Sequence, residues 1–148
     1  MLSGRSALAS VFLCSVCLVV LPQQPAGKIR CSRDLFKQVD TIKKIVTDKD
    51  WLDCKLYSPT VQDVKHNCSS STLRCFAAEM NVLTMELVDS GLKYDLRMKI
   101  SRGLERLAKL LEQTESACRQ CEFFTEKNAT MFLEDLVLTL KAIYEKHC

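Results

Sequence analysis

The sequence predicts an all-α protein, a short-chain four-helix bundle with up-up-down-down connections that is stabilised by disulfides. Three observations support this fold class. Four segments carry apolar residues at helical spacing on one side and charged residues on the other. One link between these segments is short and two are long. A C-x6-C pair and a C-x2-C pair follow an apolar leader, which favours disulfide chemistry.

Residues 1–26 are predicted to form a secretory signal peptide, and residues 27–148 the helical domain. Arg5 is the only charge of the leader, and an apolar run over 7–21 ends at Pro22. A membrane span needs roughly 20 apolar residues, so an N-terminal anchor is the weaker alternative. We therefore expect a secreted, extracellular protein without membrane insertion.

Length and charge set further bounds. The chain carries a formal charge of +3, and loss of Arg5 with the leader leaves 3 − 1 = +2. Nucleic-acid-binding domains are usually far more basic, so we expect no nucleic-acid partner. The roughly 120 residues that remain suffice for one domain with one core.

The first and second helices are predicted over 34–47 and 72–88. Their apolar stripes repeat at i, i+4, i+7 and i+11. The stripes are Leu35, Val39, Ile42 and Val46 in the first helix and Phe76, Met80, Leu83 and Leu87 in the second. Ser70 or Ser71 is expected to cap the second helix and Gly91 to end it. No segment has a convincing strand pattern.

The third and fourth helices are predicted over 94–112 and 126–146. Their stripes are Leu96, Ile100, Leu104, Leu107 and Leu111 in the third helix and Phe132, Leu136, Leu140 and Ile143 in the fourth. The short link at Asp89-Ser-Gly makes the second and third helices antiparallel neighbours. The long links over 48–71 and 113–125 fit two crossovers. An up-down-up-down bundle with long loops is the alternative topology.

The cysteine spacing predicts two parallel bridges. Nine cysteines, less the two of the leader, leave seven. Cys68 and Cys75 lie about 10 Å apart along a helix, and an extended segment from Cys118 to Cys121 also reaches about 10 Å. The bridges are therefore Cys68–Cys118 and Cys75–Cys121. A four-cysteine zinc site is the alternative, but C-x6-C is a poor zinc half-site and the leader favours disulfides.

An odd cysteine count leaves one thiol without a partner inside the chain. In this topology the first and fourth helices are antiparallel, which brings Cys31 near Cys148 and makes a bridge between them natural. Cys54 is then the remaining thiol, under the first crossover. We expect no metal and no cofactor.

The second helix carries a predicted acidic flank. The residues that lie about a quarter turn from its core stripe are Cys75, Glu79, Val82 and Glu86. The bridge to Cys121 brings Glu122 and Glu126 to the same flank. The expected result is an acidic edge around an exposed Val82, which suits a basic partner. An ordinary solvated charged face is the alternative.

Two segments resemble the interleukin-2 and interleukin-15 family of cytokines, and in particular its interleukin-15 members. They are Cys-Phe-Ala-Ala-Glu-Met-Asn-Val-Leu-Thr-Met-Glu at 75–86 and Cys-x-x-Cys-Glu-x-x-x-Glu-Lys-Asn at 118–128. The similarity extends to Leu56-Tyr57 and the fourth helix, and is loose in the first helix. It implies a cytokine bundle with the two bridges paired as above, and a sushi-type α receptor that grips the acidic edge. The α-receptor residues that it implies are Tyr57, Glu79, Val82, Glu86, Glu122 and Glu126.

The resemblance also implies β and common γ receptor chains that signal in lymphocytes. The β-contacting aspartate of the family has its nearest counterpart in Asp40, with a one-residue offset. The γ-contacting glutamine falls on Lys141, which changes the local charge. The additional Cys31, Cys54 and Cys148 suggest an interleukin-15-like branch.

Two weaker signals concern carbohydrate. Asn67-Cys-Ser and Asn128-Ala-Thr are N-glycosylation sequons. We expect poor occupancy at Asn67, beside a bridge, and an available site at Asn128, in the first turn of the fourth helix. A basic face of the third helix could attract heparan sulfate, with a plain solvated face as the alternative. It consists of Lys99, Arg102, Arg106 and Lys109.

Two other function classes fit less well. His66 and His147 form no nucleophile–base pattern, so we expect no enzyme. A saposin-like lipid-binding protein is also secreted, helical and rich in disulfides, but it usually places six cysteines in paired clusters at both ends of a shorter domain. The expected function is that of a secreted cytokine that binds receptors, with the saposin-like lipid binder as the alternative.

Overall fold

The computed structural model describes residues 28–49, 52–112 and 117–148, and the predicted signal peptide lies outside them. In chain order the elements are α2 (Asp34–Thr47), β1 (Lys55–Tyr57), α3 (Val61–Lys65), α4 (Ser69–Val88), α5 (Tyr94–Leu110), a 3-10 turn (Cys121–Phe123), β2 (Glu126–Asn128) and α6 (Ala129–His147). None of the described helices is long and apolar enough to cross a bilayer.

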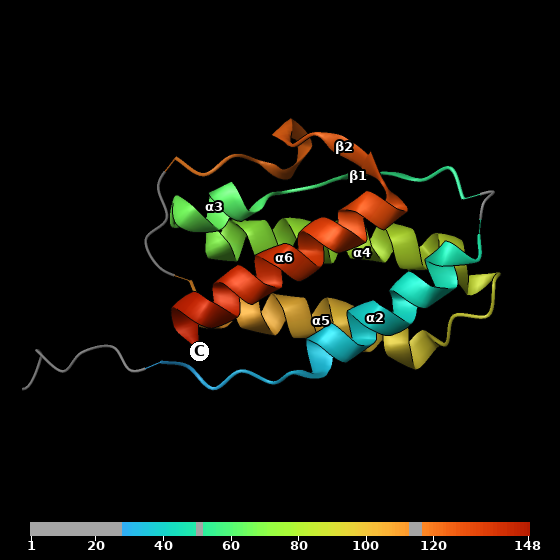
Figure 1. Cartoon of the computed structure of the whole chain (residues 1–148), viewed down its shortest axis with the longest axis horizontal. Helices are drawn as coiled ribbons and strands as arrows, with labels where there is room; N and C mark the ends of the chain where they lie inside the picture. Colours follow the sequence, from blue (N-terminus) through green and yellow to red (C-terminus); the bar gives the residue numbers. More distant parts are fainter. Residues whose placement is uncertain (1–27, 50–51, 113–116) are drawn as a thin grey trace, which may run out of the picture.

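The four long helices form the predicted up-up-down-down bundle. Figure 1 shows α2 and α4 running in one direction and α5 and α6 in the other. α4 packs along α5, to which a short turn joins it, whereas α2 packs against α6 and α5. The helices on either side of each long link, α2 with α4 and α5 with α6, are therefore parallel, as two crossovers require.

The predicted apolar stripes form the core. Those of α2, α4 and α6 are buried along their whole length, and that of α5 is buried except at the partly buried Leu96. Phe76 and Phe132 meet between α4 and α6, with ring centroids 5.4 Å apart. Each such large side chain stabilises the fold by about 1.5–3 kcal/mol through its burial.

The start of α4 differs from the prediction. Cys68 occupies the N-cap position, so the expected cap at Ser70 or Ser71 was wrong. Ser70 lies inside the helix, where its hydroxyl donates to the Ala108 carbonyl of α5 at 2.9 Å. Because its buried hydroxyl has this partner, Ser70 is accommodated within the helix. Gly91 follows the end of α4 with a φ of +94°, as a helix-ending glycine should.

Two short strands were not expected, and the prediction that no strand exists was wrong. β1 and β2 pair antiparallel in the register Lys55–Asn128, Leu56–Lys127 and Tyr57–Glu126. Because Glu126 belongs to β2, α6 begins at Ala129 and not at Glu126. Leu56 is fully buried and anchors this two-stranded ribbon to the bundle. Strands of three residues are too short to show an alternating pattern in the sequence.

All three predicted disulfides are present. They are Cys68–Cys118, Cys75–Cys121 and Cys31–Cys148, with Cα distances of 5.8, 5.2 and 5.8 Å. The four cysteines of the alternative zinc site are therefore bonded to one another as two disulfides. Cys54 is the free cysteine among the described residues, as predicted.

A polar network fastens the ribbon to α6. Asp135 accepts hydrogen bonds from the Ser58 hydroxyl at 2.7 Å and from the Lys127 ammonium at 2.6 Å. The side chains of Lys127 and Asp135 are only 22% and 20% exposed. Each charge is therefore partly withdrawn from water and depends on the other.

Lys127→Met should lower the free energy of unfolding by about 2 kcal/mol, because it leaves the Asp135 carboxylate without its cation. Adding Asp135→Asn should recover most of that loss, since the amide oxygen still accepts from Ser58. Lys44→Met is the matched control, because its ion pair with Asp40 is well exposed and contributes less than about 0.5 kcal/mol. Urea unfolding measures each variant. Equal losses for Lys127→Met and Lys44→Met would contradict the role given to the network.

Candidate functional site at an acidic edge

Two disulfides hold the second crossover against one flank of α4. Cys68 stands at the N-cap position of α4 and is bonded to Cys118. Cys75, about two turns further on, is bonded to Cys121. Figure 1 shows the segment at 117–128 on the same side of the bundle as β1. The flank of α4, the 3-10 turn and the ribbon therefore form one surface.

Tyr57 lies at the centre of this surface. Its backbone N–H donates to Oε2 of Glu79 at 2.8 Å, and strand pairing places Glu126 opposite it. The pKa of the Tyr57 hydroxyl is raised, first by the charge of Glu126, then by desolvation and a hydrogen bond to Glu126, and further by the charges of Glu79 and Glu122. Three of the predicted carboxylates thus lie close enough to act on one phenol.

Glu79 is the least solvated carboxylate of the edge. It is half-buried, whereas Glu86, Glu122 and Glu126 are exposed. Burial raises the pKa of the Glu79 carboxyl, the hydrogen bond from the Tyr57 N–H opposes this, and the charge of Glu126 raises the pKa further. The ionised form of Glu79 is therefore less favourable in the folded protein than in water. A carboxylate placed where its charge destabilises the fold is a candidate for binding a partner.

Apolar side chains stand exposed among these carboxylates. Val82 is 46% exposed on the predicted flank of α4. The pKa of the Cys54 thiol is raised, first by burial and then by the charges of Glu86 and Glu79. Strand β1, which follows Cys54, packs against α4, so this part of the first crossover lies beside α4. Phe123, in the 3-10 turn, is 70% exposed. It was missed in the sequence, although the Phe-Phe pair after the C-x2-C motif was an available signal.

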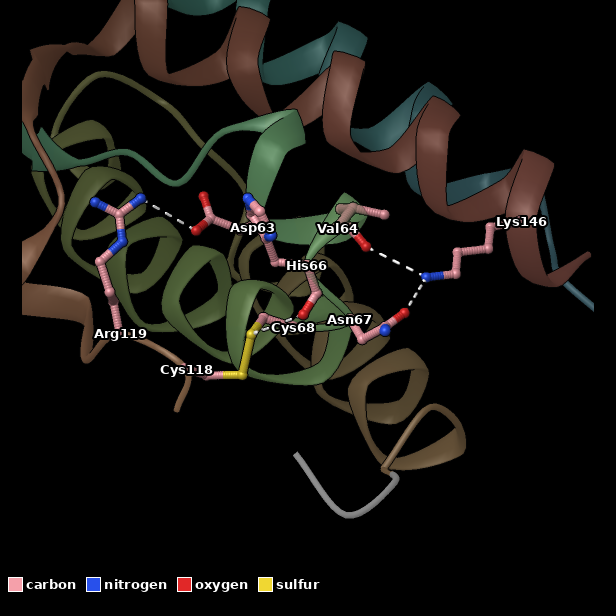
Figure 2. The surroundings of a disulfide bond; sticks show 8 residues. All are labelled: Asp63, Val64, His66, Asn67, Cys68, Cys118, Arg119 and Lys146. Atoms are coloured by element: carbon pink, nitrogen blue, oxygen red, sulfur yellow. Dashed lines mark hydrogen bonds and ion pairs between the residues drawn. A yellow bond between two sulfur atoms is a disulfide. The ribbon is translucent and has the colours of Figure 1, made fainter. Parts of the chain in front are cut away.

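An ion pair braces the crossover beside the first bridge. Arg119 donates to Oδ1 of Asp63 at 3.2 Å, and its guanidinium carbon lies 4.9 Å from the centroid of the Phe124 ring. Asp63 belongs to the short helix α3, which was not predicted. Figure 2 shows this pair beside the Cys68–Cys118 disulfide. A covalent bond and an ion pair therefore fix the same part of the crossover.

The other predicted receptor residues lie away from the edge. Asp40 is exposed on α2 and forms an ion pair with Lys44 at 2.9 Å. Lys141 is exposed on α6, about 18 Å along the helix from the end that follows β2. The structure thus brings Glu79, Glu122 and Glu126 to Tyr57. It places Val82 and Glu86 further along α4, and Asp40 and Lys141 on other helices.

The two sequons lie in different settings. Asn128 is exposed and caps α6, where its side-chain oxygen accepts from the Met131 N–H at 2.9 Å, so it precedes the helix and does not lie in its first turn as predicted. Asn67 has a φ of +61°, and its side-chain oxygen accepts from Nζ of Lys146 at 2.7 Å. Figure 2 shows Lys146 reaching across to Asn67.

Comparison with known proteins gives one consistent family. The family described as Interleukin 15 matches residues 11–144 of the chain. Interleukin-15 of Homo sapiens is 29% identical over 127 residues, which cover 86% of this chain and 74% of the relative. Interleukin-15 of Felis catus is 28% identical over 131 residues, covering 88% and 76%. Interleukin-15 of Marmota himalayana is 32% identical over 101 residues, covering 68% and 60%.

Glu79→Gln should make the protein more stable at neutral pH. Burial raises the folded-state pKa of Glu79 above its ordinary value of 4.5, so the stability that protonated Glu79 contributes is present below pH 4.5 and is lost as the pH rises through the raised pKa. Glutamine does not ionise, and its oxygen still accepts from the Tyr57 N–H. In urea unfolding at pH 7 the variant should have the higher free energy of unfolding. At pH 3.5 the variant and the wild type should be equally stable. A variant less stable than wild type at pH 7 would contradict the assignment.

Proposed function

The chain belongs to the interleukin-15 family, and from this premise we propose that it is a secreted cytokine whose acidic edge docks a sushi-type α receptor. Family and fold together identify the chain as a cytokine with a disulfide-stabilised four-helix bundle. The observation that supports α-receptor docking at the acidic edge is the convergence of Glu79, Glu122 and Glu126 on Tyr57.

The charge of the edge indicates the chemistry of its partner. The whole chain has a formal charge of +3, yet four carboxylates gather near Tyr57 and Val82: Glu79, Glu86, Glu122 and Glu126. A basic receptor surface is attracted to such an edge before contact, which raises the association rate and makes it sensitive to salt. The proposed receptor surface is therefore rich in arginine and lysine.

Val82 and Phe123 supply an apolar centre to the proposed interface. Both are large exposed apolar side chains beside acidic residues. Interfaces commonly concentrate their affinity in a few desolvated central residues with polar groups around them. Two disulfides already order the crossover segment of the edge. The conformational entropy lost on receptor binding is therefore smaller than for a flexible segment.

The signalling chains bind elsewhere in this proposal. Asp40 on α2 is the candidate for the β chain, and Lys141 on α6 is the candidate for the common γ chain. An α-bound cytokine therefore still presents both faces, and it acts on lymphocytes by bringing the two chains together, with no bond made or broken. Family membership favours this function over the saposin-like alternative.

Secretion and glycosylation complete the proposal. Residues 1–26 direct export, and the three disulfides suit an oxidising compartment. Asn128 is the proposed glycan site, because it is exposed. Asn67 is proposed to stay unmodified, because Lys146 holds its side chain and the next residue forms a bridge.

Glu126→Lys should weaken capture of the α-receptor ectodomain by about tenfold or more, mostly through a slower association rate that depends on salt. Glu105→Lys, an exposed position on α5, makes the same change in net charge and should alter affinity by less than about twofold. Surface plasmon resonance at two salt concentrations measures both. If Glu126→Lys binds like wild type, or both variants weaken equally, the receptor does not dock at the edge.

Asp40→Ala and Lys141→Glu should retain α-receptor capture and raise the concentration needed for a half-maximal lymphocyte response by about tenfold, because each alters a signalling-chain contact alone. Lys44→Ala is the control for Asp40, since it removes the ion pair at 2.9 Å but keeps the carboxylate. The measurements are receptor capture and cell response with the same preparations. An unchanged response to Asp40→Ala and Lys141→Glu would remove both residues from the proposal.

A further inference from the structure

The outward side of α5 carries a row of cations. Its members, spaced at i, i+3, i+7 and i+10 on one face of the helix, are Lys99, Arg102, Arg106 and Lys109. All four are exposed, and the row spans about 15 Å. We call this row the basic ridge. Among the described residues none of the four forms an ion pair. The pKa of the Glu112 carboxyl is lowered first by a hydrogen bond from Arg74 and the charge of Arg74, and also by the charge of Lys109.

A groove runs along each side of the basic ridge. The groove between α2 and α5 has a volume of about 560 Å³, and the groove between α4 and α5 about 570 Å³. Arg102 and Arg106 line both. Arg30 and Lys99 add positive charge to the first groove, against Asp34 and Asp95. Arg74 and Lys109 add it to the second, against Glu105. Cations therefore outnumber carboxylates in both grooves.

We infer that the basic ridge binds a sulfated glycosaminoglycan of the heparan sulfate class. Such a chain is a linear polyanion, and a linear row of flexible cations with grooves on both sides matches repeated sulfate groups along its length. The two central positions are arginines, Arg102 and Arg106. The planar guanidinium group of arginine donates paired hydrogen bonds to the oxygens of a sulfate group, which a monatomic anion such as chloride cannot accept in this way.

Two other polyanions fit the ridge less well. Ile100, Leu104 and Leu107 of α5 are buried in the core. The exposed large apolar residues of this helix, Tyr94 and Leu110, lie near its two ends, so they form no continuous apolar face to insert into a membrane. Anionic lipids are also concentrated in the cytoplasmic leaflet, which a secreted protein does not meet. A nucleic acid would require a much more basic balance than a formal charge of +3.

Different neighbours of α4 carry the centre of the basic ridge and the acidic edge, although Arg74 and Ala78 of α4 line both the second groove and the hollow beside Glu122. Figure 1 shows the ribbon along one side of α4 and α5 along the other, and α4 contacts both β1 and α5. A glycosaminoglycan centred on Arg102 and Arg106 therefore lies over α5 and leaves Tyr57 and Glu126 of the ribbon free. The cytokine can be retained on extracellular matrix while its α-receptor edge stays accessible.

The test compares two double variants that remove the same charge. Arg102→Gln with Arg106→Gln changes the centre of the ridge, and Lys37→Gln with Lys65→Gln changes exposed lysines that line neither groove. Binding of the secreted, disulfide-bonded protein to immobilised heparan sulfate is measured by surface plasmon resonance over a series of salt concentrations. Desulfated heparin, phosphatidylserine vesicles and single-stranded RNA are the comparison ligands. Lys99→Gln with Lys109→Gln is a second ridge variant, and thermal unfolding verifies each fold.

The ridge variants should bind heparan sulfate about tenfold or more weakly, with a slope of log affinity against log salt that is smaller by about two. The control pair should stay within about twofold, and desulfated heparin should bind poorly. Capture of the α-receptor ectodomain should be unchanged by ridge variants and by saturating heparan sulfate. Equal weakening by the control pair, tighter binding to vesicles or RNA, or no binding at 0.15 M salt would each overturn the inference.

Discussion

The second crossover is held along the flank of α4 by Cys68–Cys118 and Cys75–Cys121, and the acidic edge depends on this constraint. The bridges span sequence separations of 50 and 46 residues. Chain entropy alone gives each bridge about 4 kcal/mol, and less when both are present, because the first already shortens the second loop. Their local effect matters more for function. Strands of three residues do not persist in water by themselves. β2 pairs with β1 between the crossover that the bridges hold and the start of α6.

Polar contacts then fix what the disulfides bring together. Arg119 and Asp63 hold the crossover near its first bridge, and Lys127 and Asp135 hold the ribbon on α6. Both pairs involve a mostly buried carboxylate, so each favours one arrangement of the segment over others. The result is an ordered loop on which Glu122, Phe123 and Glu126 hold fixed positions relative to Glu79.

The bundle was predictable because its signals repeat over long segments. The stripes of α2, α4 and α6 are buried as predicted, and α2 has the predicted bounds. The disulfides were predictable because seven- and three-residue spacings match only when helix and extended chain lie side by side. The ribbon and α3 were not predictable, because three to five residues carry no measurable period. The N-cap of α4 was misplaced because the partner of Ser70 is Ala108, 38 residues away in sequence.

The most direct test of the role of the disulfides removes one bridge and measures how ordered the acidic edge remains and how tightly it binds the α receptor. Cys75→Ser with Cys121→Ser keeps Cys68–Cys118 and Cys31–Cys148, so the bundle should remain folded. Hydrogen exchange and α-receptor affinity are measured on the same sample. The account predicts fast exchange at 122–128, protection in α5 and α6 as in wild type, and affinity weaker by at least about tenfold, because the receptor must then order the segment itself. Wild-type protection at 122–128 together with wild-type affinity would contradict the claim that the disulfides build the edge.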